Sequence, residues 1–106
     1  MAKPIARGDG VDSVFSLTGS GTNCLSPMTT ATDECSDNVF VNGTGVVRID
    51  DQVANHPAAG CGPDTSLLTT GSFSVFVNGK GVGREGDQYT ADNTITSGSA
   101  NVFAGD

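Results

Sequence analysis

The sequence predicts an all-β domain built from three β-hairpin repeats with pseudo-threefold symmetry. The first observation is an internal repeat, because Val39–Arg48 (VFVNGTGVVR) returns 36 residues later as Val75–Arg84 (VFVNGKGVGR). The second is that each end of the chain carries half of a further unit. Ser99–Phe103 repeats the front half, and Lys3–Asp9 resembles the back half. The two termini therefore complete a third repeat, and three units closed in this way imply a pseudo-threefold axis.

The composition agrees with short strands and tight turns. The 106 residues include 15 glycines, one tyrosine and no tryptophan, and 36% of them are hydrophobic. Glycine with abundant serine, threonine, asparagine and aspartate is typical of turns, so we expect almost no helix. A chain of this length forms one domain, residues 1–106, with a small core. Small cores usually need a disulfide or a metal to stabilise them.

Charge and hydropathy exclude several classes of function. The net charge of −7, with only five basic residues, disfavours nucleic-acid binding because a phosphate backbone would be repelled. No run of 18 apolar residues exists that could span a bilayer, and the N-terminus lacks the apolar segment of a signal peptide. We therefore expect synthesis in a host cytoplasm, where free thiols or thiolate ligands are favoured over disulfides.

Two hairpins are predicted to turn at Asn42-Gly43 and Asn78-Gly79. A type I′ turn needs positive φ at both central residues, and Asn-Gly tolerates this best. Side chains alternate along a strand, so Val39 and Val41 share one face and Phe40 points to the other. The same alternation holds at Val75–Val77. The pattern does not decide which face is buried.

Three connectors join the repeats, roughly Gly10–Cys35, Val53–Gly71 and Tyr89–Gly98. The first has no clear periodicity, which indicates an ordered but irregular loop. In a threefold arrangement all three connectors lie at the same end of the molecule. Residues from different connectors can then meet near the axis.

Four soft metal ligands lie in the first two connectors: Cys24, Cys35, His56 and Cys61. A Cys₃His set suits tetrahedral zinc, so we favour a metal site. A disulfide between Cys24 and Cys35, with Cys61 buried, is an alternative, as are unlinked residues. His56 alone would more often be a surface or hydrogen-bonded loop residue.

Three arginines occupy equivalent places, and each is shortly followed by an aspartate. These pairs could form a ring of charges for a partner, but support between repeats is the more ordinary role of an arginine at a strand end. The expected pairs are Arg7 with Asp9, Arg48 with Asp51, and Arg84 with Asp87.

The sequence offers no catalytic grouping. No pair of carboxylates falls in a pattern typical of glycoside hydrolysis, and Asp50-Asp51 does not reproduce an EF-hand loop. The serines have no partner base beyond His56, which disfavours a hydrolase. We therefore expect a protein that is not an enzyme.

The repeat resembles the PAAR-repeat family, the small cone-shaped tips of contractile injection machines, over nearly the whole chain. The shared pattern is Ser-x-x-Val-Phe-Val-Asn-Gly-x-x-x-x-Arg-x-x-Asp at Ser36–Asp51 and Ser72–Asp87, with the opening Lys3–Asp9 and the closing Gly98–Phe103. The signature Pro-Ala-Ala-Arg is only partly kept in the three units, which read Pro-Ile-Ala-Arg, Gly-Val-Val-Arg and Gly-Val-Gly-Arg, and Asp50 replaces the expected glycine. The resemblance implies three hairpins that form the walls of a short cone.

The resemblance also implies one zinc or iron ion near the apex, bound by connector residues. His56 matches the histidine of the family that follows the second Arg-x-x-Asp, and Cys61 begins a Cys-Gly-Pro found in phage members. Cys24 lies where the first connector usually supplies a ligand. Cys35 stands where a glycine normally precedes the Ser-x-x-Val segment, and the third connector lacks the expected cysteine.

The implied function is mechanical. Such a protein, monomeric in isolation, caps the trimeric central spike of a phage tail, one copy per trimer, and sharpens it for piercing the cell envelope. It would be located in the virion, at the baseplate, and the absence of a fused toxin domain favours a phage tail over a type VI secretion spike. A free-standing receptor- or glycan-binding module is the alternative from another class, motivated by the acidic, Ser/Thr/Asn-rich connectors.

Overall fold

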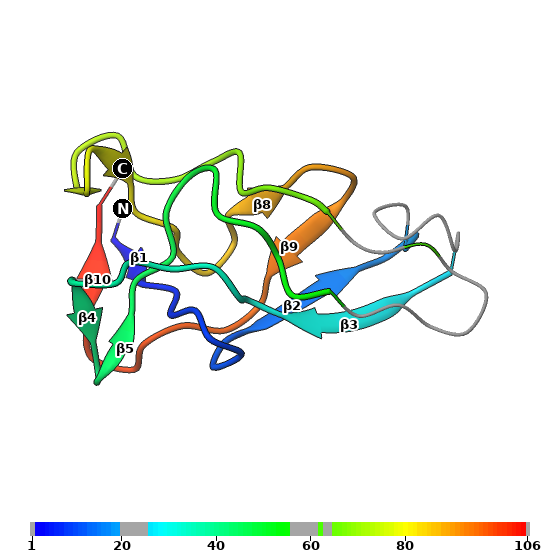
Figure 1. The fold of residues 1–106 in the computed structure, drawn as a ribbon, viewed down its shortest axis with the longest axis horizontal. Helices are drawn as coiled ribbons and strands as arrows, with labels where there is room; N and C mark the ends of the chain where they lie inside the picture. The colour runs from blue at the N-terminus through cyan, green and yellow to red at the C-terminus, as the bar shows by residue number, and fades with distance from the viewer. Residues whose placement is uncertain (1, 20–25, 56–61, 63–64, 106) are drawn as a thin grey trace.

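The computed structural model describes residues 2–19, 26–55, 62 and 65–105 (Figure 1). These residues form ten strands and no helix, which confirms the all-β class. The molecule is longer along one axis, with extents of 38 × 25 × 24 Å. None of the described segments is a helix that could cross a membrane. The strands are β1 Lys3–Pro4, β2 Ser13–Ser16, β3 Met28–Ala31, β4 Phe40–Val41, β5 Thr44–Gly45, β6 Phe76–Val77, β7 Lys80–Gly81, β8 Gln88–Tyr89, β9 Asn93–Ile95 and β10 Phe103–Ala104.

Both predicted hairpins are present. Strand β4 pairs with β5 and β6 pairs with β7, in each case antiparallel across a two-residue turn. The backbone φ is +53° at Asn42 and +80° at Gly43, and it is +54° at Asn78 and +78° at Gly79. Positive φ at both central positions is what a type I′ turn requires, so the Asn-Gly pairs act as predicted.

The two ends of the chain pair with each other. Strand β1 lies antiparallel to β10, with Lys3 opposite Ala104 and Pro4 opposite Phe103. In Figure 1 both termini lie close together at one end of the long axis, at the ends of β1 and β10. We call this end, which carries β1, β4, β5, β6, β7 and β10, the hairpin end.

Backbone hydrogen bonds join the three pairs into a closed cycle. The amide of Val47 donates to the carbonyl of Ala6 (3.1 Å), that of Ala6 to Gly83 (2.9 Å), and that of Gly83 back to Val47 (2.8 Å). Each of these residues immediately precedes one of the three arginines. We call this cycle the backbone ring. A second set of amide-to-carbonyl bonds runs beside it, from Gly8 to Gly45, from Ile49 to Gly81 and from Glu85 to Pro4.

A small apolar core fills the hairpin end. Val41 and Val77 are each 8% exposed, whereas Phe40 and Phe76 are 58% and 59% exposed. The valine face of each hairpin is therefore the inner one, which the sequence alone had left open. The buried cluster consists of Ile5, Val41, Val46, Val77, Val82 and Ala104.

A four-stranded sheet in the order β3-β2-β9-β8 extends away from the hairpin end (Figure 1). The first connector was expected to be an irregular loop, and this was wrong, because β2 and β3 lie within it. Val14 and Ser16 of β2 are buried while Ser13 and Phe15 are exposed, but four residues are too few for this alternation to stand out in the sequence. The core beneath the sheet contains Ala6, Val14, Val47, Val53, Leu68, Tyr89 and Ile95.

We predict that Gly45→Ala destabilises the hairpin end by about 2 kcal/mol or more, at the upper part of the range for overpacked sites. A Cβ at Gly45 would lie 2.2 Å from the carbonyl oxygen of Ser36, which belongs to the backbone and cannot move aside cheaply. The matched control is Gly105→Ala, whose Cβ would meet only the Ser74 hydroxyl, at 3.8 Å. Urea denaturation should separate the two variants, and equal stabilities would contradict the packing described here.

Candidate functional site

Each of the three arginines forms a two-pronged contact with one aspartate. In Arg48–Asp51, Nε donates to Oδ2 and Nη2 donates to Oδ1, both at 2.9 Å, and the arginine amide also donates to Oδ2 at 2.8 Å. Arg84 and Asp87 repeat this pattern atom for atom. Planar, bidentate pairs of this kind are among the stronger and more directional contacts in proteins. They fix the strand ends on which the backbone ring depends.

The predicted partner of Arg7 was wrong, because Arg7 binds Asp12 and not Asp9. The amide and Nε of Arg7 donate to Oδ2 of Asp12 at 2.7 and 3.0 Å, and Nη2 donates to Oδ1 at 3.0 Å. The unit formed by the chain ends has a longer turn after its arginine, in which Asp9 adopts a φ of +55° and is exposed. Asp12 is buried and occupies the place that Asp51 and Asp87 hold in the other units.

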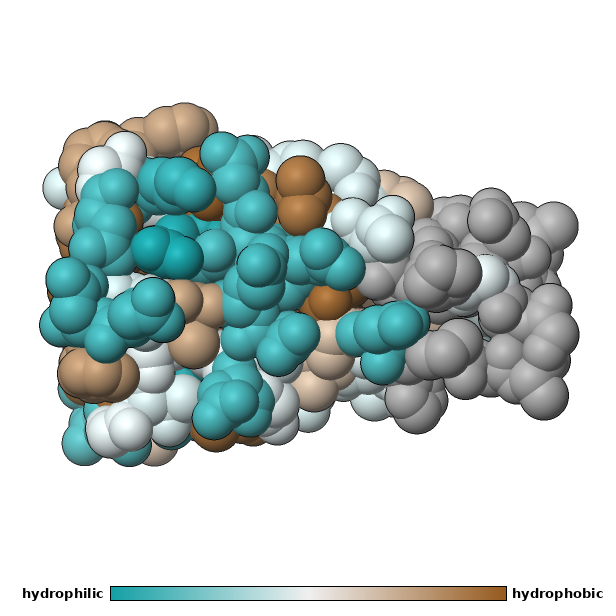
Figure 2. All heavy atoms as spheres, in the orientation of Figure 1, coloured by the Kyte–Doolittle hydropathy of each residue, from teal (hydrophilic) through white to brown (hydrophobic). Residues whose placement is uncertain are grey.

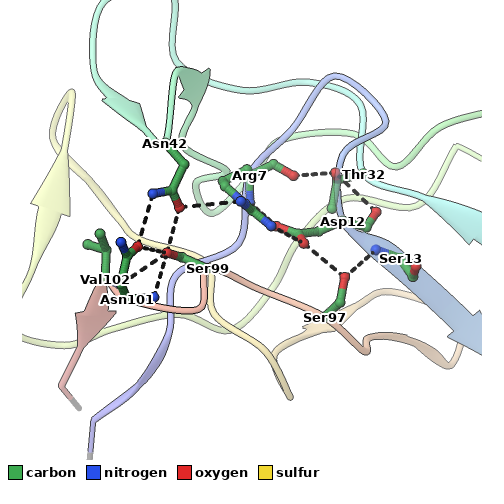
Figure 3. Close-up of polar contacts among 9 residues, drawn as sticks. All are labelled: Arg7, Asp12, Ser13, Thr32, Asn42, Ser97, Ser99, Asn101 and Val102. Carbon is green, nitrogen blue, oxygen red and sulfur yellow. Dashed lines mark hydrogen bonds and ion pairs between the residues drawn. The ribbon is translucent and has the colours of Figure 1, made fainter.

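The charge of Asp12 is stabilised where it is buried. Burial by itself would raise the pKa of this carboxyl, but hydrogen bonds from Arg7 and Ser97, together with the charge of Arg7, outweigh it and lower the pKa. The same contact raises the pKa of Arg7. The pair is therefore ionised at neutral pH and holds the start of β2 against the strand end at Arg7 (Figure 3).

The Asn-Gly turns bind the neighbouring unit through their side chains. Oδ1 of Asn42 accepts from the hydroxyl of Ser99 (2.6 Å) and from Nη1 of Arg7 (3.3 Å), and its Nδ2 donates to Asn101 at 2.9 Å (Figure 3). The first hairpin is thus tied to the unit formed by the chain ends.

The second hairpin repeats these contacts one unit further on. Oδ1 of Asn78 accepts from Ser36 (2.7 Å) and from Nη1 of Arg48 (3.0 Å), and Nδ2 donates to Asn38 at 3.0 Å. We call the contacts of Asn42 and Asn78 the turn clamps.

In the unit formed by the chain ends, a backbone carbonyl takes the place of the asparagine side chain. The carbonyl of Gly105 accepts from the hydroxyl of Ser72 and from Nη1 of Arg84. A serine recurs at the same place in every unit, as Ser36, Ser72 and Ser99, and this was the sequence signal for these contacts. The sequence did not show that each serine binds a residue of the neighbouring unit.

Three exposed phenylalanines stand on the outer strands of the hairpin end. Phe40, Phe76 and Phe103 lie on β4, β6 and β10 and are 58%, 59% and 52% exposed. Within the described part of the chain, each of these strands pairs on one side only, with β5, β7 or β1. Figure 2 shows apolar surface at the hairpin end beside a broad hydrophilic band. Exposed aromatics next to open strand edges are typical of a docking surface.

Of the four predicted metal ligands, only Cys35 belongs to the described residues, and Cys24, His56 and Cys61 lie outside them. Cys35 is a half-buried free thiol. Its Sγ would be only 2.7 Å from a Cβ built on Gly8 or on Gly45, so both glycines make room for it.

At the corresponding place in the second hairpin unit, the large and the small residue are exchanged. There Gly71 stands in place of Cys35, and a Cβ on it would lie 3.1 Å from Ile49 Cγ1. Packing therefore accounts for Cys35 without a metal.

The thiol of Cys35 is kept protonated by its surroundings. Burial raises its pKa, and the carboxylates of Asp51 and Asp9 raise it further. Because the thiolate is the form that binds metal, this environment does not favour coordination. Among the described residues no three His, Cys, Asp or Glu side chains gather as a metal site would require.

A scan against models of known protein families gives no match, and a search of curated proteins finds no similar chain. The function is therefore inferred from the hairpin end itself.

We predict that Asp12→Asn destabilises the protein by about 2–3 kcal/mol at neutral pH, because it leaves the Arg7 charge without its buried partner. Asp9→Asn, the control, should change stability by less than about 0.5 kcal/mol, since Asp9 is exposed and asparagine tolerates its positive φ. Thermal denaturation of both variants measures this difference.

The effect of Asp12→Asn should depend on pH. The pKa of Asp12 is lower in the folded state than in the unfolded state, so its contribution is present above the unfolded pKa and is lost as the pH falls through the folded pKa. The wild-type protein should therefore approach the stability of Asp12→Asn in acid. A difference that stays constant from neutral to strongly acidic pH would contradict this assignment.

Proposed function

We propose that this protein is a spike-tip protein that caps the trimeric β-helical central spike of a contractile phage tail and sharpens it for piercing the cell envelope. In this proposal the three hairpin units stand about a pseudo-threefold axis as the walls of a short cone. The cyclic backbone ring supports such an arrangement because it links each unit to the next in the same sense, and the Arg–Asp contact recurs once in every unit.

The observation that carries the proposal is the set of three outer strands, each with one open edge and one exposed phenylalanine. A homotrimer presents three identical surfaces around its axis, and a single chain fits it only by offering three equivalent surfaces of its own. Strands β4, β6 and β10 offer them. Main-chain pairing along the edges would supply affinity, and the aromatic side chains would supply buried contact area.

The remainder of the structure suits a part that bears load. The backbone ring and the turn clamps cross-link the units, and a bidentate Arg–Asp pair stiffens each unit, so force applied along the long axis meets hydrogen bonds in every unit. The four-stranded sheet extends to the other end and shares buried Ala6 and Val47 with the ring. In this proposal that end faces the target envelope.

The proposal includes one zinc or iron ion held by connector residues, with Cys24, His56 and Cys61 as its ligands. A metal bound there would restrain the connectors against separation. Cys35 is the least suited of the four sequence-predicted ligands because packing and a raised pKa already account for it.

A second candidate function, binding of an envelope glycan, has one specific observation in its favour. On β2 the half-exposed ring of Phe15 lies between Thr29 and Thr94 of the neighbouring strands, and Gln88 follows Thr94 across the sheet. An aromatic ring flanked by hydroxyl groups can contact a sugar through both its apolar and its polar faces. Glycan binding by the isolated protein, lost in Phe15→Ser, would support this candidate.

We predict that the protein and its spike form a complex of one copy to three spike chains. Native mass spectrometry of the mixture measures the ratio directly. A ratio of three to three, or the absence of any complex, would count against the proposal. The same geometry suits a type VI secretion spike, and the trimer that binds, from a phage tail or from a secretion apparatus, distinguishes the two.

We predict that Phe76→Ser lowers affinity for the spike about tenfold, and that the triple change of Phe40, Phe76 and Phe103 abolishes binding. The folded state should persist because these rings are more than half exposed. Phe15→Ser, on the four-stranded sheet, is the control and should bind normally. Equal binding by all variants in titration calorimetry would remove the outer strands from the interface.

We predict about one equivalent of zinc or iron in protein purified without a histidine tag. Elemental analysis should show that Cys61→Ser loses the metal and that Cys35→Ser retains it. Less than about a tenth of an equivalent in the wild-type protein, with freely titrating thiols, would reject the metal site while leaving the spike-binding proposal intact.

A further inference from the structure

The two hairpin turns are also sites of potential chemical modification. In an Asn-Gly pair the glycine nitrogen can attack Cγ of the asparagine because no side chain shields it. The new C–N bond closes a five-membered succinimide and ammonia leaves. Water then opens the ring to aspartate or, by cleavage at the other carbonyl, to isoaspartate. Both Asn42 and Asn78 are exposed, so burial does not keep water or base away from them.

The turn clamps oppose this reaction. Before the attack, the carboxamide must rotate toward the glycine nitrogen, and in both hairpins it is held elsewhere by three hydrogen bonds. Asn42 is held by Ser99, Arg7 and Asn101, as Figure 3 shows. Asn78 is held by Ser36, Arg48 and Asn38. All of these partners belong to a neighbouring unit, so the reaction requires that two units separate.

We propose that Asn42 and Asn78 are deamidation sites gated by the contact between units. While the clamps are closed the carboxamides are protected, and when neighbouring units part they become reactive. This inference does not depend on the proposed function.

Modification would prevent the units from closing again. Isoaspartate places an additional carbon in the backbone of a two-residue turn, and the pairing of Val41 with Thr44 or of Val77 with Lys80 depends on that turn length. The new carboxylate also lacks the Nδ2 donor that binds Oδ1 of Asn101 or Asn38. A transient opening would thus become a permanent change.

The remaining contact between units, from Ser72 to the Gly105 carbonyl, supplies a matched control. Ser72 hydrogen-bonds the amides of Ser74 and Val75 within its own unit, just as Ser36 bonds those of Asn38 and Val39. Ser99 does the same with Asn101 and Val102. Ser72 differs in its partner across the units, which is the Gly105 carbonyl instead of an asparagine, and in having the Ser74 hydroxyl as its local side-chain neighbour. Replacing it removes the same local contacts without releasing a carboxamide.

The experiment compares Ser36→Ala, Ser99→Ala and Ser72→Ala with the wild-type full-length protein at mildly alkaline pH. Peptide mass spectrometry locates each deamidation, and enzymatic methylation of isoaspartate identifies the product. We expect Ser36→Ala to accelerate deamidation at Asn78 about five- to tenfold and Ser99→Ala to do so at Asn42, as the loss of one hydrogen bond implies. Ser72→Ala should accelerate neither.

Two results would overturn the inference. If the wild-type turns deamidate as fast as unfolded peptides of the same sequence, the clamps do not protect them. If Ser72→Ala accelerates both sites as much as the other variants do, general destabilisation explains the effect and the local gate is wrong. A variant that fails to fold is recognised by circular dichroism, and Asn38→Ala or Asn101→Ala, which remove a different clamp contact, then test the same site.

Discussion

The hairpin end depends on the backbone ring, in which the amides of Val47, Ala6 and Gly83 each donate to the next member. Bridges between Ile5 and Arg84, Arg7 and Val46, and Arg48 and Val82 pair the segments that follow β1, β5 and β7 with one another. Among the described strands of the hairpin end, β4, β6 and β10 are the ones that pair on one side only. At Gly83 the ring leaves little room for a side chain, since a Cβ there would lie 2.8 Å from Leu68 Cδ2 and Leu68 would have to shift. In one of the three units the paired strands, β1 and β10, come from opposite ends of the chain and no hairpin turn joins them, so the chain ends are structural parts of the hairpin end.

The ring couples the two halves of the molecule. Ala6 and Val47 are fully buried and belong to the core beneath the four-stranded sheet, while Val46 and Ile5, one position earlier in each unit, belong to the core of the hairpin end. Successive side chains of a strand point to opposite faces, so a single short strand serves both cores. A displacement of the hairpins therefore disturbs the packing of the sheet, and this coupling is consistent with the load-bearing role proposed above.

The sequence predicted those features that recur in each unit at fixed spacing. The Asn-Gly turns were predicted because turn type depends on the residues of the turn itself. The pairing of the chain ends was predicted because the repeat can be recognised without knowledge of distant contacts. The partner of Arg7 was missed because the first turn is longer than the other two, and the nearer Asp9 appeared equivalent. Strands β2 and β3 were missed because they contain four residues each and are stabilised mainly by neighbours distant in sequence. The metal site was predicted from the types of its residues, not from their spacing. It stays a prediction because Cys24, His56 and Cys61 lie outside the described part of the chain.

Main-chain atoms carry the ring, and this explains how the unit formed by the chain ends can keep its place although its side chains differ from those of the two hairpin units. Gly45–Arg48 and Gly81–Arg84 share glycine, valine and arginine, whereas Pro4–Arg7 has only the arginine in common with both. A larger residue at one position is matched by a glycine at the position beside it. Cys35 packs beside Gly8 in one unit, and the corresponding residues of the next unit are Gly71 and Ile49. Asp50 accepts a φ of +77° where Gly86 has +94°, so even the turn glycine can be replaced at some cost in strain. A single chain can thus keep a cycle of three hydrogen bonds while its connectors diverge in length and chemistry, which three identical chains could not do.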